Sequence, residues 1–138
     1  MKIEFVAGVT PIVPDAAAGV AFYRDALGLP LEGDGDYAHT DRIPGVKHLG
    51  VWPLSLAARS CFGRDAWPDD VPVPQATVEF EVADEAAVQA AAEELAAAGR
   101  RLIHEARTEP WGQTVARLLG PEGLLIGITY TPWMHPAR

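Results

Sequence analysis

The sequence contains a single cysteine, Cys61, and only two serines, Ser55 and Ser60. One thiol excludes an internal disulfide and any zinc site built from several cysteines. Neither serine lies in a G-x-S-x-G motif, so the nucleophile of an α/β-hydrolase is absent. We therefore expect neither a disulfide framework nor serine hydrolase chemistry.

Positive charge and long apolar runs are also scarce. The chain has 11 Lys and Arg against 19 Asp and Glu, a formal net charge of -8, which argues against binding to a phosphate backbone. No apolar run reaches membrane-spanning length, and the start, MKIEFVAGV, lacks a signal-peptide pattern. We expect a cytoplasmic protein with no nucleic-acid or membrane partner. The acidity can serve solubility or attract a cationic ligand, and composition leaves both open.

What the sequence does contain is a repeat. FVAGVTPIVPDAAAGVAFYRDALGLPLE, near the start, and ATVEFEVADEAAVQAAAEELAAAGRRLIHE, past the middle, share one order of strand pattern, Asp, helix pattern, Gly and second strand pattern. Asp15 and Asp84 fit helix N-caps, and Gly28 and Gly99 fit the position after a helix, where a positive φ is needed. With 138 residues, the chain suits one domain of two similar modules with a groove between them.

Local patterns predict the remaining elements. Each half follows the order βαβββ, an α+β pattern with antiparallel strands, in a first module over 1–63 and a second over 76–138. Val9, Pro11 and Val13 of the first strand are expected to pack on the helix. That helix has an apolar stripe of Val20, Tyr23 and Leu27, which Phe22 and Ala26 widen. The predicted elements are strands over 3–13, 46–54, 76–82, 100–106, 114–120 and 124–131, a hairpin over 30–43 that turns at Gly33, Asp34, Gly35 and Asp36, helices over 16–27 and after Asp84, a helical turn over 55–63, and a Pro-rich linker over 64–75.

Three motifs point to a known family. FYRDALGL after a capped strand, PWG before a strand, and GPEGLLIGI at the end resemble the vicinal oxygen chelate superfamily, which includes glyoxalase I, extradiol dioxygenases, and fosfomycin- and bleomycin-resistance proteins. The resemblance covers almost the whole chain. It implies two pseudo-symmetric βαβββ modules whose mostly antiparallel sheets curl into a cup, with helices outside. Because many members are dimers, some with exchanged halves, it also implies a homodimer.

The same resemblance locates the metal ligands of the metal-dependent members. A His lies about seven residues before the capping Asp in each half, and a Glu lies on the last strand. Here those positions hold Gly8, Thr77 and Gly127, none of which has the imidazole or carboxylate that such metals favour. His48 lies near a fourth ligand position and could hold a displaced metal with a glutamate, or be an ordinary polar strand residue. We expect no metal and no other cofactor.

Strand alternation predicts which side chains face the cup. Thr77, Glu79 and Glu81 alternate with apolar residues that pack on the helix. Two carboxylates on an apolar floor are costly unless they are solvated or paired. They could bind a cationic ligand, supply a general base, or be neutralised by an arginine such as Arg117. Trp52 and Trp111 could stack on a planar ligand or simply pack in the protein. The candidate ligand-binding residues are Thr10, His48, Trp52, Thr77, Glu79, Glu81, Trp111 and Thr129.

Two functional hypotheses follow. The first is a metal-free protein of the drug-sequestering type, which binds a small cationic aromatic natural product. It resembles the bleomycin-resistance branch. The second is a lyase, isomerase or dioxygenase of the superfamily with a displaced or metal-free active site. A regulatory domain without a small ligand is a third possibility. The sequence does not name the ligand.

Overall fold

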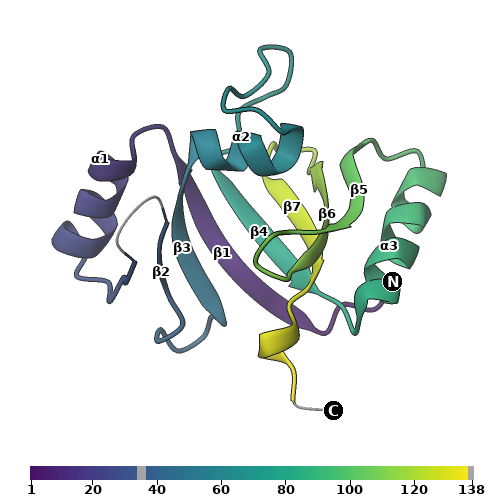
Figure 1. Ribbon diagram of the computed structural model, residues 1–138, viewed down its shortest axis with the longest axis horizontal. Coiled ribbons are helices and arrows are strands. Elements are labelled where there is room, and N and C mark those ends of the chain that lie inside the picture. Colours follow the sequence, from purple (N-terminus) through teal and green to yellow (C-terminus); the bar gives the residue numbers. More distant parts are fainter. Residues whose placement is uncertain (34–36, 137–138) are drawn as a thin grey trace.

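A computed structural model describes residues 1–33 and 37–136 (Figure 1). The predicted turn residues Asp34, Gly35 and Asp36 lie outside the described residues. Seven strands form one sheet in the order β2-β3-β1-β4-β7-β6-β5. The strands are β1 Phe5–Val13, β2 Ala38–Thr40, β3 His48–Pro53, β4 Ala76–Glu81, β5 Leu102–Thr108, β6 Thr114–Leu119 and β7 Leu125–Tyr130. The helices are α1 Ala16–Val20, which continues as the π-helical η1 Ala21–Ala26, then α2 Leu54–Phe62, α3 Glu85–Ala97 and the short η2 Pro132–Met134.

The α+β class with two βαβββ modules is confirmed. The second half has the order β4-α3-β5-β6-β7, with β4 parallel to β7. In the first half β1 is parallel to β3, and the strand expected after the helix is reduced to a single bridge between Glu32 and His39. Antiparallel pairing of β1 with β4 joins the halves into a continuous sheet.

The pairing of β1 with β4 reveals the internal symmetry. Val9 lies opposite Val78, and on either side of this pair Thr10 lies opposite Thr77 and Gly8 opposite Glu79. A two-fold axis between the two valines therefore exchanges Gly8 with Thr77 and Thr10 with Glu79. This is the same offset along the chain that relates Asp15 to Asp84, so the sequence repeat is also a structural one.

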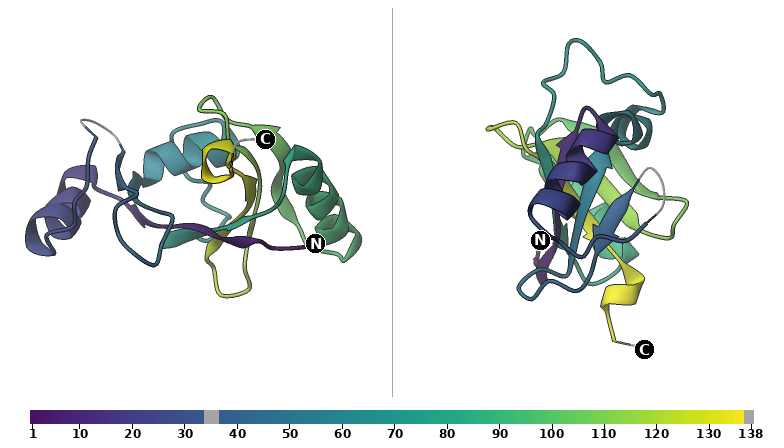
Figure 2. Two further views of the ribbon diagram at one scale, coloured as in Figure 1. Left: turned by 90° about the horizontal axis from the view of Figure 1, so that it is seen from below. Right: turned by 90° about the vertical axis from the view of Figure 1, so that its left-hand side faces the viewer.

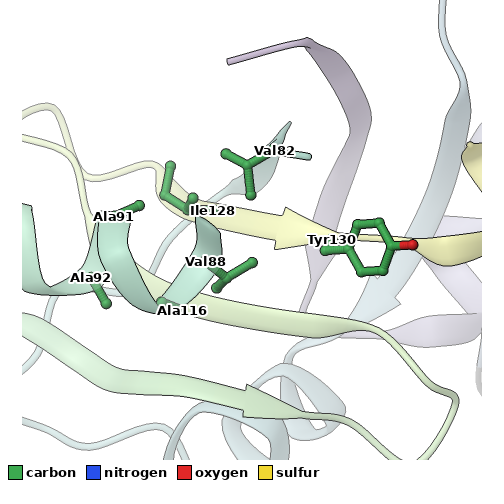
Figure 3. Close-up of a cluster of buried hydrophobic side chains, with 7 residues drawn as sticks. All are labelled: Val82, Val88, Ala91, Ala92, Ala116, Ile128 and Tyr130. Carbon is green, nitrogen blue, oxygen red and sulfur yellow. The ribbon is translucent and has the colours of Figure 1, made fainter. Parts of the chain in front are cut away.

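The outer face of the second half is closed by α3 (Figure 3). Asp84 caps the helix, because its Oδ1 accepts a hydrogen bond of 2.8 Å from the backbone N–H of Ala87. Alternation along the strands sends apolar side chains outward to meet the helix. The buried cluster comprises Val82, Val88, Ala91, Ala92, Ala116, Ile128 and Tyr130. Burial of this cluster holds β4 and β7 in register beneath the helix.

The inner face of the sheet is partly covered by α2, which crosses it between the two halves (Figure 1). Ala57, Ala58 and Cys61 of α2 are buried against Ile12 of β1 and Leu125 of β7. The linker over 64–75 has neither helix nor strand, as predicted. Its Trp67 is a core residue: the ring is buried and Nε1 donates to the carbonyl groups of Val71 and Pro72.

The outer face of the first half differs from the prediction. Most of the apolar stripe of α1 and η1 does not pack on β1. Gly19 of α1 lies against Val13, but η1 has no buried residue, and Phe22 and Leu27 are more than half exposed. Val9 of β1 is also exposed. Figure 2 shows the reason, because α1 lies beyond the β2–β3 edge of the sheet and leaves the outer face of β1 open. Within the described residues, no helix is long and apolar enough to cross a membrane.

Candidate ligand-binding cup

A cavity of about 450 Å³ lies on the inner face of the sheet. Its floor is formed by β1, β3 and β4, its roof by α2, and its rim by the turn after β5 and by the C-terminal turn η2. The strand registers align His48, Gly8, Glu79 and Gly127 in one row across the floor. Gly8 and Gly127 have no side chains, and the Glu79 side chain lies over Gly127, where a Cβ would be 3.2 Å from Glu79 Cγ. The lining residues are Thr10, Tyr37, His39, His48, Trp52, Leu56, Arg59, Ser60, Thr77, Glu79, Trp111, Gln113, Arg117, Thr131 and Met134.

A second, larger cavity of about 640 Å³ lies between the linker, the end of α3, and strands β5 and β6. Its lining is mainly aliphatic and its charged residues, Asp70, Arg100 and Arg101, are exposed. Ligand sites combine an apolar wall with a few converging polar groups. The cavity on the inner face has that character and is the better candidate.

The structure places six of the eight candidate residues in the lining: Thr10, His48, Trp52, Thr77, Glu79 and Trp111. The other two lie beneath it. Glu81 is fully buried and accepts hydrogen bonds from the backbone N–H and the hydroxyl of Thr131, with His135 Nε2 a further 2.7 Å partner. Glu81 therefore anchors the C-terminal turn to the sheet.

Thr129, also fully buried, is part of a hydrogen-bond network that orients Glu79. Gln113 Nε2 donates to Glu79 Oε2 and to Thr129 Oγ1, each at 2.8 Å. Gln113 Oε1 in turn accepts from Trp111 Nε1 at 2.8 Å. Both amide hydrogens and the amide oxygen of Gln113 are thus used in hydrogen bonds. Gln113 therefore fixes the position of Trp111 at the rim relative to Glu79 on the floor. The Trp111 ring is half exposed at the mouth.

Among the described residues, Glu79 is the only carboxylate in the lining, and the arginines Arg59 and Arg117 in the same lining are paired with other carboxylates. Arg117 is buried and pairs with Glu109, with Nη1 2.6 Å from Oε1, while its guanidinium lies over the Trp52 ring at 5.6 Å. Arg59 pairs with Asp65. Among the residues that the structure describes, Glu79 has no ion-pair partner, so Arg117 does not neutralise it.

A second polar group on the floor centres on His48. Its Nδ1 lies 2.7 Å from Asp41 Oδ1, and its Nε2 lies 2.6 Å from the Tyr37 hydroxyl. Burial raises the pKa of the Tyr37 phenol above its ordinary value; a hydrogen bond with Thr10 opposes the rise, and the charges of Glu79 and Asp41 add to it. The Tyr37 hydroxyl therefore stays protonated.

The residues present do not fit the superfamily's metal site. By the internal two-fold, the ligand position of Gly127 corresponds to Gly50 in the first half, and the Tyr37 ring occupies the space where a side chain at Gly50 would lie. His48 lies two residues before Gly50 on β3, opposite Gly8. Across residues 1–33 and 37–136, no group of three or more His, Cys, Asp or Glu side chains is arranged to hold a metal ion.

One polar atom in the lining lacks a partner. The hydroxyl of Thr77 is buried and makes no hydrogen bond to any described residue. A buried hydroxyl without a partner is costly, and Thr77 is one of the residues that line the cavity. Thr77 occupies one of the expected metal-ligand positions, where it has an unsatisfied hydroxyl in place of an imidazole.

Sequence reasoning overlooked several residues of the cup. Gln113 directly follows the PWG motif, but nothing in its local pattern distinguishes an inward amide from a turn residue. Asp41 and the roof residues of α2 come from segments whose orientation depends on tertiary packing. Tyr37 could be placed only by the register of β2 with β3, which pairs His39 with Gly50.

Comparisons with known proteins agree with this architecture. A family model described as Glyoxalase/Bleomycin resistance protein/Dioxygenase superfamily matches residues 6–128. No curated protein matches the chain. A superfamily member from Vibrio splendidus 12B01 aligns with TM-score 0.57 and 15% identity, over 92% of this chain and 98% of that one.

Two further solved structures share the fold. The Mn(II)-bound glyoxalase from Novosphingobium aromaticivorans aligns with TM-score 0.59 and 22% identity, over 93% of this chain and 39% of that one. A methylmalonyl-CoA epimerase from Streptomyces coelicolor aligns with TM-score 0.55 and 17% identity, over 95% of this chain and 96% of that one. At these identities the likeness concerns the fold alone.

Proposed function

The chain belongs to the Glyoxalase/Bleomycin resistance protein/Dioxygenase superfamily, and within it we propose a metal-free protein that binds, and thereby sequesters, a cationic aromatic small molecule. The observation that carries this proposal is Glu79. It is the only carboxylate lining the cavity among the residues that the structure describes, and its one described side-chain hydrogen-bond partner is the neutral amide of Gln113. A partly buried carboxylate without a cation is stabilised by a ligand that brings one.

The remaining walls suit a planar ring system. Trp52 and Trp111 present indole faces, and His39 and His48 stack with a ring-centroid distance of 5.5 Å on the other side of the floor. Rigid aromatic walls with a few fixed polar groups are typical of small-molecule sites.

Titration with proflavine, a planar aromatic cation, tests the proposal through quenching of tryptophan fluorescence and by calorimetry. We expect Glu79→Gln to weaken proflavine binding by about tenfold or more, because a charge-assisted contact is lost. Glu122→Gln, in the exposed turn before β7, is the matched control and should bind as the wild type does.

Three results would count against this function. They are failure of the wild-type protein to bind proflavine, equal affinity of the Glu79→Gln variant, or tighter binding of the anion anilinonaphthalene sulfonate. Elemental analysis tests the metal-free state separately: stoichiometric metal that is lost in His48→Ala would contradict it.

The proposed partner of this binding protein is a second copy of the chain. Six of the nine large exposed apolar residues among those described lie in the first 27 residues. In the second half the equivalent sheet face is covered by α3, whereas α1 does not reach its own face. The open face therefore matches the shape of a helix like η1, and η1 itself has an unburied apolar side. An exchanged α1–η1 from another copy would cover both.

A further inference from the structure

The hydrogen bonds of His48 have a defined direction. The Asp41 carboxylate can only accept, so His48 Nδ1 carries the proton and donates to it. In the neutral imidazole, Nε2 then has a free electron pair, which accepts the hydroxyl proton of Tyr37 at 2.6 Å. The chain Asp41–His48–Tyr37 is thus aligned so that a proton can pass from the phenol to the imidazole.

The three groups are held in place by their surroundings. The rings of Tyr37, His39 and His48 stack with centroid distances of 5.3 to 5.8 Å. The Tyr37 hydroxyl lies over Gly50, where any side chain would collide with it. Glycine at this position therefore admits the phenol into the floor of the cup, and the stack fixes its orientation.

The space above Gly8 is flanked by both polar groups of the floor. A Cβ on Gly8 would lie 3.0 Å from the carbonyl oxygen of His48, 3.6 Å from the Cβ of His48 and 3.8 Å from Glu79 Oε1. The Cα atoms of His48 and Glu79 are separated by two strand spacings, about 10 Å. A small ring bound in the cavity above this row would contact the Tyr37–His48 pair on one side.

We propose that Tyr37, His48 and Asp41 form a proton relay that gives this cup a metal-independent proton-transfer activity on neutral aromatic or carbonyl compounds with an acidic C–H group. The Tyr37 oxygen takes the substrate proton as its own proton passes to His48 Nε2. Tyr37 remains a neutral phenol throughout, in accord with the raised pKa of its buried hydroxyl. The imidazolium so formed is stabilised by Asp41, which is a positioning residue. The electron pair of the broken C–H bond stays on the substrate.

The base-promoted ring opening of 5-nitrobenzisoxazole tests this activity with a neutral planar probe. The relay removes the proton from carbon 3, the C–H pair becomes the third bond of a nitrile, and the N–O pair leaves on the phenolate oxygen. The proton on His48 then returns to water. We expect the wild-type protein to accelerate phenolate release, measured by absorbance, above the rate of an equal concentration of imidazole.

Variants separate the relay from other bases. Tyr37→Phe and His48→Gln should each lower kcat/KM by about 100-fold, the usual contribution of a general base. Asp41→Asn should lower kcat by about tenfold and leave KM unchanged, since Asp41 acts on the imidazole and does not touch the probe. Tyr23→Phe, which removes a phenol from η1 outside the cup, should match the wild type.

Nitrogen NMR of His48 gives a readout that does not depend on turnover. We expect the proton of the neutral ring on Nδ1 in the wild type and in Tyr37→Phe, and an increased share on Nε2 in Asp41→Asn. The relay would be overturned by a proton on Nε2 in the wild type, by a wild-type rate no greater than that of free imidazole, or by full activity in folded Tyr37→Phe.

The relay and the proposed binding function can fail independently. The benzisoxazole probe is neutral and does not need Glu79 as a counter-ion. If Glu79→Gln abolishes ring opening while Tyr37→Phe does not change it, Glu79 is the base and the relay assignment is wrong. If proflavine does not bind but the Tyr37 and His48 variants lose ring opening, the binding proposal fails and the relay stands.

Discussion

At the scale of single residues, a buried group beside the cup couples the fold to pH. His104 of β5 donates from Nδ1 to the carbonyl of Glu105 at 2.7 Å, and its Nε2 lies 3.2 Å from Arg117 Nη1. Because the guanidinium can only donate, Nε2 must be the acceptor and the ring is neutral. Burial lowers the pKa of His104 to about 4, the carbonyl bond opposes this, and the charges of Arg117 and Arg107 add to it.

The pH dependence of His104 follows from this depressed pKa. In the unfolded chain His104 takes up a proton as the pH falls below about 6.5, while in the fold it does so only near 4. Its contribution to stability is therefore complete above pH 6.5, declines as the pH falls from 6.5 to 4, and changes no further below. Urea unfolding across this range should show a free-energy difference between wild type and His104→Gln that narrows on acidification. Parallel pH profiles for the two proteins would contradict the assignment.

At the scale of elements, two helices with the same start signal have different roles. Asp15 and Asp84 both cap a helix: Asp15 Oδ1 accepts from the backbone N–H of Ala18 at 3.0 Å, much as Asp84 does from Ala87. Yet α3 buries Val88, Ala91 and Ala92, whereas Gly19 is the one buried residue in α1 and η1. Helical stability in proteins comes mainly from packing of an apolar face. The helix capped by Asp84 therefore contributes more to the stability of the fold than the helix capped by Asp15.

Alanine substitution of the two caps measures this difference. Asp84→Ala should lower the free energy of unfolding by about 1 kcal/mol, because fraying of α3 exposes the core beneath it. Asp15→Ala should cost less in the monomeric protein, since α1 can fray without opening the core. Chemical denaturation at low protein concentration compares them. Equal losses would show that α1 is as strongly coupled to the fold as α3.

At the scale of the whole molecule, the unequal covering of the two halves is the main feature. One outer face of the sheet is closed by α3 and the other is open, with Val6 and Val9 exposed upon it. Internal symmetry would give both faces a helix. The exchanged helix proposed above would restore that symmetry without altering the cup, which opens on the other side of the sheet.

Light scattering after size exclusion tests this assembly. The wild type should have the mass of a dimer, and Val9→Glu or Phe22→Glu should shift it to the monomer by placing a charge in the covered face. Val73→Glu changes a more exposed valine in the linker and should leave the dimer intact. A monomeric wild type, or a Val9→Glu variant that remains dimeric, would refute the exchange.

The order of elements in the two βαβββ modules follows from local signals in the sequence, namely strand alternation, the Asp caps and the Gly stops. The exception is the strand after the first helix, which is reduced to the bridge between Glu32 and His39. It also predicted which faces of β1, β3, β4 and β7 point inward, since alternation has a period of two and the registers match it. That argument placed Thr77 and Glu79 in the lining of one cavity.

The contacts between side chains that are distant along the chain could be known only from the folded structure. Whether Glu81 faces the cavity or is buried depends on the C-terminal turn that returns to cover it, and Thr131 and His135 are 50 or more residues away along the chain. The partner of Arg117, the contact of Tyr37 with His48 and the position of α1 likewise depend on long-range packing. Local sequence patterns indicate which face of a strand a side chain is on and whether it tends to be buried. Which residue that side chain contacts depends on how segments distant along the chain pack together.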